Sequence, residues 1–454
     1  MKKEKNNTKT EQELLSRRVF MQKCSQGAMA LSAASTLTGC ARAVKISYTS
    51  DMRCLDASPD RRSPNKSYID VYDFDKCIEC GDCLSGCVFR AYSEEESIQA
   101  IKNLRKGKNC SDYLDDCLFC LKCNHRCPEQ AMPAALLLER MSEKTRKNGG
   151  VKPLVNYLTN GLQEKGYKEN IFSDLAKSYT NKEKKIIAEW SEPKICDDLL
   201  FNGCGARVFP LPLAESKVLA DLPIFGGQYD CCGIISSRLG QFEQGRYITN
   251  NLIDRLSKSS FKRLVVYCGS CQEQLTVMFP DYIGQEFPFQ TISLYEWIDE
   301  QMQKGKFAVQ REVEFDCAIS DSCHGAEFGD DYLNTIRRLC TAIGMKIVEL
   351  EHHGKNNACC GGAALLKEGE VRDWLKAAKV KEDDIKKSGK KHVVSYCGGC
   401  HIVSRLLHPV DSHYLMDNVM WALGDDRKEY HFRRRFLRGS LLLKALRYCP
   451  SMLI

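Results

Sequence analysis

The stretch Cys268-Gly269-Ser270-Cys271 closes a five-cysteine pattern that occurs twice in this chain. The first copy is Cys204, Cys231-Cys232-Gly233 and Cys268-Gly269-Ser270-Cys271; the second is Cys323, Cys359-Cys360-Gly361 and Cys397-Gly398-Gly399-Cys400. Between the cysteine pair and the C-x-x-C, 35 residues intervene in the first copy and 36 in the second. The matched order and spacing predict a duplicated cysteine site rather than scattered core cysteines.

The composition is that of an ordinary soluble protein except for its cysteines. At 454 residues the chain is long enough for two to four domains, each with its own core. A chain of this length with 43% hydrophobic residues does not need disulfide staples, so 26 closely spaced cysteines indicate metal thiolates. Thiolates select soft partners such as zinc and iron–sulfur clusters.

The positive charge of the chain is confined to its two ends. Residues 1–40 carry a net charge of +4 and residues 427–454 one of +7, so the body between them has a net charge of −4. That body shows no basic stripe interleaved with aromatic residues, which argues against a nucleic-acid surface. We therefore expect no nucleic-acid partner.

The N-terminal segment, residues 1–43, has the pattern of an export signal. Ser16-Arg17-Arg18-Val19-Phe20 matches the core of twin-arginine signals, and a weakly apolar run follows it. Leu37-Thr38-Gly39-Cys40 resembles a lipobox, which would make Cys40 a lipidated residue, and Ala41-Arg42-Ala43 is an alternative cleavage site. The rest of the sequence has no run of about 18 apolar residues that would span a membrane.

Two further cysteine runs are spaced like those of bacterial ferredoxins. They are Cys77-x-x-Cys80-x-x-Cys83-x-x-x-Cys87 and Cys117-x-x-Cys120-x-x-Cys123-x-x-x-Cys127-Pro128. In such runs three cysteines bind one [4Fe–4S] cluster and the fourth reaches the neighbouring cluster. We therefore predict one cubane cluster on Cys77, Cys80, Cys83 and Cys127, and a second on Cys117, Cys120, Cys123 and Cys87. Zinc is the alternative, but zinc sites usually pair two C-x-x-C units across a longer gap.

The sequence changes character after this ferredoxin-like region, residues 68–140. Residues 141–195 have the polar, Lys- and Glu-rich pattern of connecting helices without chemistry of their own. In 196–300 and 310–424, short β-branched runs such as Val265-Val266 alternate with helical patterns. We predict a helical ferredoxin domain followed by two repeated α/β domains, a mixed α/β and α+β fold. The cysteines would lie on loops after strands, where ligands gather in open α/β sheets.

The repeated cysteines resemble those of the CCG-domain proteins, which include the catalytic subunit of heterodisulfide reductase. The order of a two-cluster ferredoxin and two CCG domains is similar to the fused heterodisulfide reductase subunit. It is also similar to the C subunit of anaerobic glycerol-3-phosphate dehydrogenase. The resemblance implies one or two [4Fe–4S] clusters in the CCG domains, of an unusual noncubane type, besides the two cubanes.

The resemblance also assigns cluster ligands residue by residue. They are Cys204, Cys231, Cys232, Cys268 and Cys271 in the first copy, and Cys323, Cys359, Cys360, Cys397 and Cys400 in the second. Cys204 precedes its cysteine pair by 26 residues, whereas Cys323 precedes its pair by 35. Cys196 would restore that length with 34 and stays an alternative, although Phe201-Asn202-Gly203-Cys204 matches the context of the family. If Cys204 is misplaced, the first site would hold a conventional cubane on four ligands.

Two histidines and the C-terminal tail complete the candidate features. His324 and His401 each follow a predicted ligand, so we expect them near the second copy, as hydrogen-bond partners of cluster sulfur or as proton donors. The tail, residues 425–454, combines Arg433-Arg434-Arg435 with several leucines. Such a basic amphipathic pattern suits a membrane surface or a partner subunit.

These features together predict an electron relay. The sequence shows no G-x-G-x-x-G after a strand and no P-loop, so a flavin or nucleotide site within it is not evident. We expect an iron–sulfur electron-transfer subunit of a heterodisulfide-reductase-like or respiratory complex, with a flavoprotein or a membrane quinone-reactive subunit as partner. The alternatives are a disulfide reductase acting at the second CCG site and a purely structural metal protein. The signal predicts twin-arginine export to the periplasm or the outer face of the cytoplasmic membrane, with attachment through Cys40 or the tail.

Overall fold

The computed structural model describes residues 65–427 except 109, 160–169, 369–370 and 409. The predicted export signal, Cys40 and the basic tail beyond 427 therefore lie outside the described residues. No helix in the described part of the chain combines the length and the apolar character that crossing a bilayer requires.

The first described region is a small helical domain built around the two ferredoxin-like cysteine runs. Its elements are η2 (Tyr68–Val71), α2 (Asp82–Ser85), α3 (Glu94–Lys106), α4 (Ser111–Asp115), α5 (Cys123–Arg126) and α6 (Pro133–Lys147). Helix α3 begins at a capping box, in which Ser93 accepts a hydrogen bond from the Glu96 N–H, and ends at the left-handed Gly107. Leu104 of α3 and Leu136 of α6 are completely buried in the core that supports the cysteine loops.

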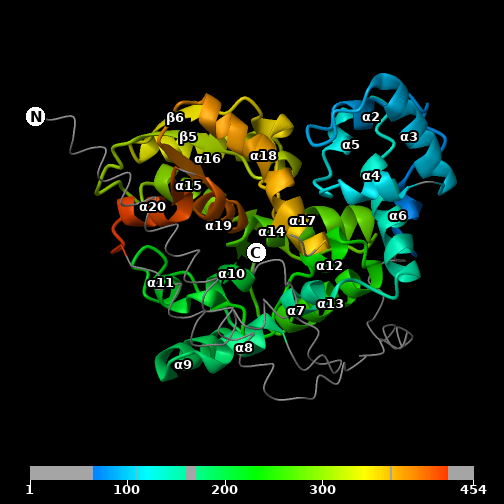
Figure 1. The fold of residues 1–454 in the computed structure, drawn as a ribbon. Coiled ribbons are helices and arrows are strands. Elements are labelled where there is room, and N and C mark those ends of the chain that lie inside the picture. The colour runs from blue at the N-terminus through cyan, green and yellow to red at the C-terminus, as the bar shows by residue number, and fades with distance from the viewer. Residues whose placement is uncertain (1–64, 109, 160–169, 369–370, 409, 428–454) are drawn as a thin grey trace, which may run out of the picture.

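The described part of the segment predicted as a helical connector contains three helices, which join this domain to the rest of the chain. They are α7 (Pro153–Leu158), α8 (Ile171–Lys177) and α9 (Asn181–Trp190). Figure 1 shows α8 and α9 along the lower edge of the molecule, beneath α10.

Two four-stranded parallel sheets with the same topology form the remaining domains. The first α/β domain has the strand order β2-β1-β3-β4 and the second β6-β5-β7-β8, with every neighbouring pair parallel. The strands are β1 (Asp198–Phe201), β2 (Ile224–Phe225), β3 (Arg263–Val266), β4 (Gln290–Ser293), β5 (Asp316–Ser320), β6 (Lys346–Glu349), β7 (His392–Ser395) and β8 (Asp411–Tyr414). The equivalence of the two sheets confirms the predicted fold of repeated α/β domains.

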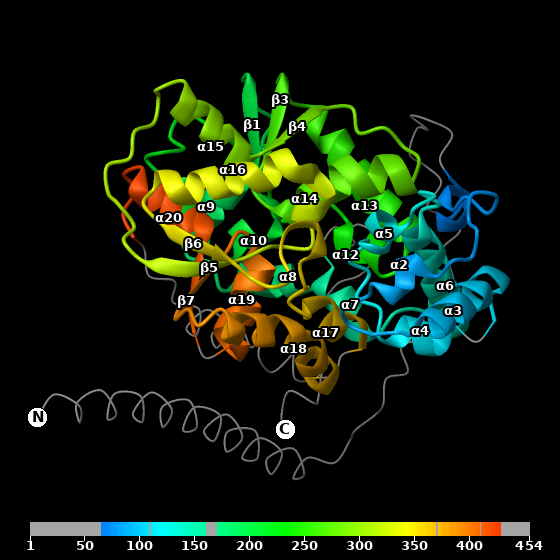
Figure 2. The ribbon, with the colours of Figure 1, turned by 90° about the horizontal axis from the view of Figure 1, so that it is seen from above.

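Helices alternate with these strands along the chain (Figure 2). The first domain contains α10 (Gly203–Val208), α11 (Pro210–Ala214), α12 (Ile234–Arg238), α13 (Phe242–Leu256), α14 (Gly269–Glu273), the π-helix η4 (Gln274–Tyr282) and α15 (Leu294–Gln303). The second contains η5 (Gly325–Phe328), α16 (Gly329–Ala342), η6 (Gly354–Asn356), α17 (Gly362–Glu368), α18 (Val371–Lys387), α19 (Gly398–Leu407) and α20 (Leu415–Ala422).

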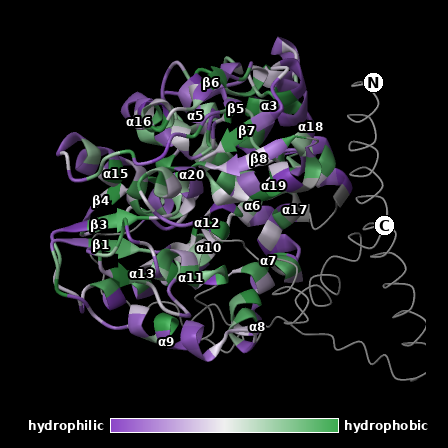
Figure 3. Cartoon of the chain, turned by 90° about the vertical axis from the view of Figure 1, so that its left-hand side faces the viewer, coloured by the Kyte–Doolittle hydropathy of each residue, from purple (hydrophilic) through white to green (hydrophobic). Residues whose placement is uncertain are grey.

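The two sheets share a hydrophobic core. Leu200 and Val265 of the first sheet and Ile319 and Val394 of the second belong to one buried cluster, which includes Ile336 of α16. Figure 3 shows the central strands β1, β3, β5 and β7 mainly in the apolar colour, as expected for parallel strands covered on both faces. The shared core fixes the two domains against each other, and with them their cysteine loops.

Candidate metal centres

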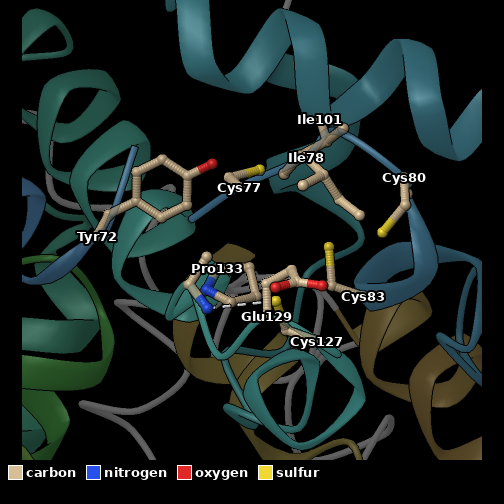
Figure 4. A pocket seen from close by; sticks show the side chains of 11 residues that line it. Tyr72, Cys77, Ile78, Cys80, Cys83, Ile101, Cys127, Glu129 and Pro133 are labelled. Carbon is tan, nitrogen blue, oxygen red and sulfur yellow. Dashed lines mark hydrogen bonds between the residues drawn. The ribbon is translucent and has the colours of Figure 1, made fainter. Parts of the chain in front are cut away.

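The first ferredoxin-like site, which we call the outer set, consists of Cys77, Cys80, Cys83 and Cys127. These four residues line one pocket, and Figure 4 shows their thiols pointing toward a shared space. Burial raises the pKa of Cys83 to about 12, and the neighbouring thiols of Cys127 and Cys77 contribute to this rise. Thiolates crowded in this way need a compensating positive charge, which a metal cluster supplies, so the residues fit such a group.

The second ferredoxin-like site, which we call the inner set, consists of Cys117, Cys120, Cys123 and Cys87. Cys87 belongs to the first cysteine run, but its charge acts on the other three thiols. Burial raises the pKa of Cys117 to about 12, against the opposing influence of Lys367. The structure therefore groups the eight cysteines crosswise, in the two sets expected from their spacing.

Both ferredoxin-like loops use left-handed backbone at the same two positions. Glu79 and Gly81 have φ angles of 59° and 84° in the first run, and Phe119 and Leu121 have 47° and 64° in the second. A left-handed conformation costs a non-glycine residue about 1–2 kcal/mol, so the loops store strain to wrap around their thiols. In the second loop the Phe119 N–H donates to Cys117 Sγ over 3.4 Å.

Each five-cysteine set lies beyond the carboxyl ends of three neighbouring parallel strands. In the first domain Cys204 follows β1, the Cys231-Cys232 pair follows β2, and Cys268 caps α14 after β3. The second domain repeats this placement after β5, β6 and β7. In open α/β sheets with this strand order, the crevice beside the central strands is where ligands bind.

In both sets the thiols form a chain of neighbours in space, and equivalent cysteines take the same places in it. The order is Cys204, Cys231, Cys232, Cys271 and Cys268 in the first set, and Cys323, Cys359, Cys360, Cys400 and Cys397 in the second. Within the described residues no three His, Cys, Asp or Glu side chains converge on a point that suits a single metal ion.

The structure places Cys204, and not Cys196, at the first set. Cys204 Sγ lies 3.6 Å from Cys231 Sγ. Cys196 precedes β1 at the other end of the strand, where its N–H donates to the Ser260 carbonyl over 3.0 Å. The approach to the first cysteine pair is shorter because it contains the short helices α10 and α11 and the two-residue strand β2, whereas the second contains the 14-residue helix α16 and the four-residue strand β6.

Hydrogen bonds between neighbouring thiols favour thiolates in both sets. The Cys231 thiol lowers the pKa of Cys232 to about 6. The Cys271 thiol lowers the pKa of Cys268 to about 7, and the Cys400 thiol lowers the pKa of Cys397 to about 5. The donating thiols Cys231, Cys271 and Cys400 have raised pKa values in turn, so each set contains both cysteines that favour the thiolate, the form that binds metal, and cysteines that favour the thiol.

The glycine that follows each cysteine pair is required by helix packing. Gly233 and Gly361 have φ angles of 90° and 83°. A Cβ at Gly233 would lie 2.9 Å from the Gly245 carbonyl oxygen of α13, and one at Gly361 would lie 2.8 Å from the Ala378 nitrogen of α18. Only glycine combines this backbone conformation with this close approach.

The first set has a cation from its own domain. Arg207, one turn after Cys204, is buried and donates to Cys204 Sγ over 3.1 Å and to the Gly203 carbonyl over 3.2 Å. Its guanidinium lies 5.4 Å from the ring centre of Phe172, which belongs to α8. The connecting helices, to which the sequence pattern assigned no chemistry, therefore cover this site.

The second set takes two of its cations from other domains, in addition to His324 of its own domain. Ala326 occupies the position equivalent to Arg207, three residues after Cys323. Arg238 of the first α/β domain donates instead to Cys323 Sγ over 3.4 Å. Lys122 of the ferredoxin-like domain is buried and donates to Asn357 Oδ1 over 2.7 Å. It also interacts electrostatically with Cys120 and Cys323. Sequence reasoning missed Arg207, Arg238 and Lys122, since no local motif marks Arg238 or Lys122.

His324 lies between the two five-cysteine sets. Its Nε2 is 2.8 Å from Ser270 Oγ, and its Nδ1 is 2.7 Å from Glu273 Oε2, both on α14 of the first domain. Beside the hydrogen bonds from Cys359 and Cys400, its positive charge helps to lower the pKa of Cys323 and Cys397 in its own domain. His401 behaves differently from the expectation, because its Nδ1 contacts Ser412 Oγ of β8 at 3.0 Å.

The ferredoxin-like domain docks on the second set. Leu118 and Cys120 of the inner set's loop pack in one cluster with Cys323, Cys359 and Cys360. Lys367 of α17 donates to the carbonyls of Leu114 (2.7 Å) and Cys117 (3.1 Å). Figure 2 shows α17 on the side of the second domain that faces α4.

Comparison with known proteins agrees with this geometry. The cysteine-rich domain family CCG matches residues 200–276 and 317–403, one match for each α/β domain. The D subunit of dihydromethanophenazine:CoB–CoM heterodisulfide reductase from Methanosarcina barkeri is 24% identical over 349 residues, covering 69% of this chain and 83% of the relative. Its counterpart from Methanosarcina mazei is 24% identical over 357 residues, with the same coverage of 69% and 83%.

A third relative is an uncharacterized iron–sulfur protein of Methanococcus maripaludis. It is 21% identical over 374 residues, covering 77% of this chain and 71% of the relative. Two segments of the chain thus match the cysteine-rich domain CCG, and the chain is similar to the D subunit of heterodisulfide reductase.

Proposed function

We propose that this chain is an iron–sulfur electron-transfer subunit of a heterodisulfide-reductase-like complex. The observation that carries the proposal is the unbroken spatial order of the four cysteine sets. The outer set meets the inner set, the inner set meets the second five-cysteine set, and that set meets the first. The relatives are named as subunits of a reductase, which supports a role inside a larger assembly.

The outer set is the end of this series nearest to solvent. Ile78, which lies within its loop, is 64% exposed. Cys83 lies on α2 and Cys123 begins α5, and these two helices pack against each other, so the outer and inner sets are neighbours. An electron-transfer partner that docks over Ile78 would reach the outer set without entering the protein.

The next two steps cross domain boundaries. Cys120 of the inner set lies within electrostatic reach of Cys323 in the second set. Cys397 of that set acts in the same way on Cys268 of the first set. Electrons entering at the outer set would therefore pass the second five-cysteine set before the first.

The residues that would hold the clusters follow from the four sets. Cys77, Cys80, Cys83 and Cys127 would hold one cubane, and Cys117, Cys120, Cys123 and Cys87 the other. We propose noncubane [4Fe–4S] clusters on the two five-cysteine sets. When bound, clusters of this kind supply one-electron storage.

The protein's own contribution is to exclude water and to balance charge. The cysteine pairs and the second C-x-x-C cysteine of both five-cysteine sets are buried. Arg207, Arg238 and Lys122 each place a cation beside these thiols, which offsets the negative charge that reduction adds.

The partner and the location are also part of the proposal. A flavoprotein or a membrane quinone-reactive subunit would supply or accept electrons, because the sequence shows no flavin motif of its own. The twin-arginine-like segment around Arg17-Arg18 supports export, and Cys40 or the basic tail would attach the protein to the membrane.

A second candidate function is reduction of a disulfide at the second five-cysteine set. The observation that favours it is the position of His324, which directly follows Cys323 in the chain and contacts the Ser270 hydroxyl of the first set's C-x-x-C at 2.8 Å. A substrate disulfide held at this place would meet both sets at once. In the relay function the same neighbourhood only transfers electrons.

Anaerobic purification of the chain, alone and co-expressed with the products of neighbouring genes, separates the two functions. The isolated chain is mixed with reduced viologen dye and a series of low-molecular-weight disulfides. Oxidation of the dye is then followed at a constant protein concentration. The relay proposal predicts reduced clusters without turnover, together with a co-purifying flavoprotein or membrane subunit. Steady disulfide-dependent dye oxidation by the isolated chain would contradict a pure relay.

A further inference from the structure

The cation at the second set is held in place by a buried carboxylate. Arg238 is 12% exposed and forms an ion pair with Glu273, which is completely buried. The other carboxylate oxygen of Glu273 contacts His324 Nδ1 at 2.7 Å. Glu273 thus ties Arg238 of α12 and His324 of the second domain to one point.

Glu273 acts on the second set through the groups that it holds. Its side chain pairs with Arg238, which in turn donates to Cys323 Sγ, and with His324, which directly follows Cys323 in the chain. A completely buried carboxylate is stable only when it is paired and hydrogen-bonded. The pair therefore has one low-energy arrangement, in which the Arg238 guanidinium reaches Cys323 Sγ at 3.4 Å. The long arginine side chain is fixed by a group that cannot itself move into solvent.

The helices that carry this pair begin at cysteines of the first set. Helix α12, which ends at Arg238, starts directly after Cys231-Cys232-Gly233. Helix α14, which ends at Glu273, is capped by Cys268 and contains Cys271. The backbone that positions the first set thus also positions the cation of the second.

We infer that Arg238 and Glu273 are positioning residues through which the first α/β domain sets the reduction potential of the second site. This inference rests on the proposed cluster at the second five-cysteine set. Reduction adds negative charge to that site, and a guanidinium that donates to Cys323 stabilises the added charge. The potential of the second site is therefore higher with Arg238 in place than without it.

The test is an EPR-monitored redox titration of anaerobically purified full-length protein. The second-site signal is identified as the one missing from Cys360→Ser. Arg238→Gln is expected to lower the midpoint potential of this signal while the ferredoxin-like signals keep theirs. Arg238→Lys, which keeps the charge, is expected to restore most of the wild-type potential.

Two further variants make the titration decisive. Because Arg238→Gln leaves Glu273 buried without its arginine, the double variant Arg238→Gln/Glu273→Gln removes both charges at nearly constant volume and is expected to lower the potential as well. The matched control is Arg338→Gln, since Arg338 of α16 forms another arginine pair between the two domains, with Asp299 of α15 at 2.7 Å. This control is expected to leave all potentials unchanged.

The outcomes separate the inference from the function on which it rests. If the wild-type protein contains iron only at the ferredoxin-like sets, the proposed function and the inference both fail. If the second-site signal is present, but its midpoint potential in both Arg238→Gln and the double variant equals that of the wild-type protein, only the inference is overturned. An equal shift in Arg338→Gln would also overturn it, because the effect would then not depend on the contact with Cys323.

Discussion

The two five-cysteine sets share one topology but differ in where their positive charges come from. The first set is served by Arg207 of its own domain and is covered by Phe172 of a connecting helix. The second set has Ala326 in place of that arginine and receives Arg238 from the first domain and Lys122 from the ferredoxin-like domain. The first domain thus supplies the arginine of its own cysteine set, whereas the second domain obtains an arginine and a lysine from the two domains that it contacts.

This difference identifies the second set as the junction of the molecule. The charge balance of the second set depends on three domains. The first set takes its arginine from its own domain, and from the second domain it is influenced by His324 and Cys397 at Cys268. The second set is also the one that contacts the inner ferredoxin-like set. The alternative drawn from the sequence, a disulfide reductase acting at the second CCG site, would make this set the end point of the electron path and not its junction.

The largest expected effect comes from removing a central ligand of either set. Cys360→Ser and Cys232→Ser should each lose one cluster, about four iron atoms per chain, because the middle thiol of each set contacts thiols on both sides. Iron and sulfide analysis of anaerobically purified protein measures this. Retention of full iron in either variant would break the equivalence of the two sets.

A smaller loss of stability is expected for Lys122→Met. The change removes a charge-assisted hydrogen bond from a buried lysine to Asn357, so the free energy of unfolding should fall by about 1.5–3 kcal/mol. Lys76→Met is the control in the same domain, since the exposed Lys76 pairs only loosely with Asp73, at 3.6 Å. Denaturant unfolding under anaerobic conditions compares the two, and equal values would show that Lys122 does not anchor the domains.

Substitutions of the glycines after the two cysteine pairs test whether both copies need the same left-handed backbone conformation there. Gly233→Ala and Gly361→Ala should each cost about 1–2 kcal/mol from the left-handed conformation alone, before the contact with the following helix is counted. Gly362→Ala should be tolerated, since its Cβ would meet nothing closer than 3.6 Å. Thermal unfolding of the three variants provides the comparison, and a neutral Gly361→Ala would separate the second copy from the first.

The smallest effect is expected at the alternative first-copy cysteine. Cys196→Ser should leave the iron content unchanged and shift stability by no more than about 0.5 kcal/mol, because Cys196 lies at the opposite end of β1 from the set. Cys204→Ser, by contrast, should change the spectrum of the first site. Loss of a cluster in Cys196→Ser would identify Cys196 as a ligand after all.

Much of this arrangement could be predicted from the sequence because cysteine spacing is a local signal. The duplicated domains, the strands that end at Cys268 and Cys397, and the crosswise ferredoxin-like grouping all follow from short motifs. The contacts between domains could not be predicted in this way. Arg238 meets Cys323 across 85 residues and Lys122 meets Asn357 across 235, and neither residue lies in a motif. Such pairs are created by the packing of whole domains, to which a single sequence gives no spacing rule.

The order of electron flow is the most direct test of the proposed series of sites. Protein is mixed with a reduced donor, frozen at successive times, and studied by EPR in wild type, Cys360→Ser and Cys232→Ser. We predict that loss of the second-site cluster in Cys360→Ser prevents rapid reduction of the first site. We also predict that Cys232→Ser leaves reduction of the second site at the wild-type rate. Reduction of the first site at the wild-type rate in Cys360→Ser would contradict the proposed series.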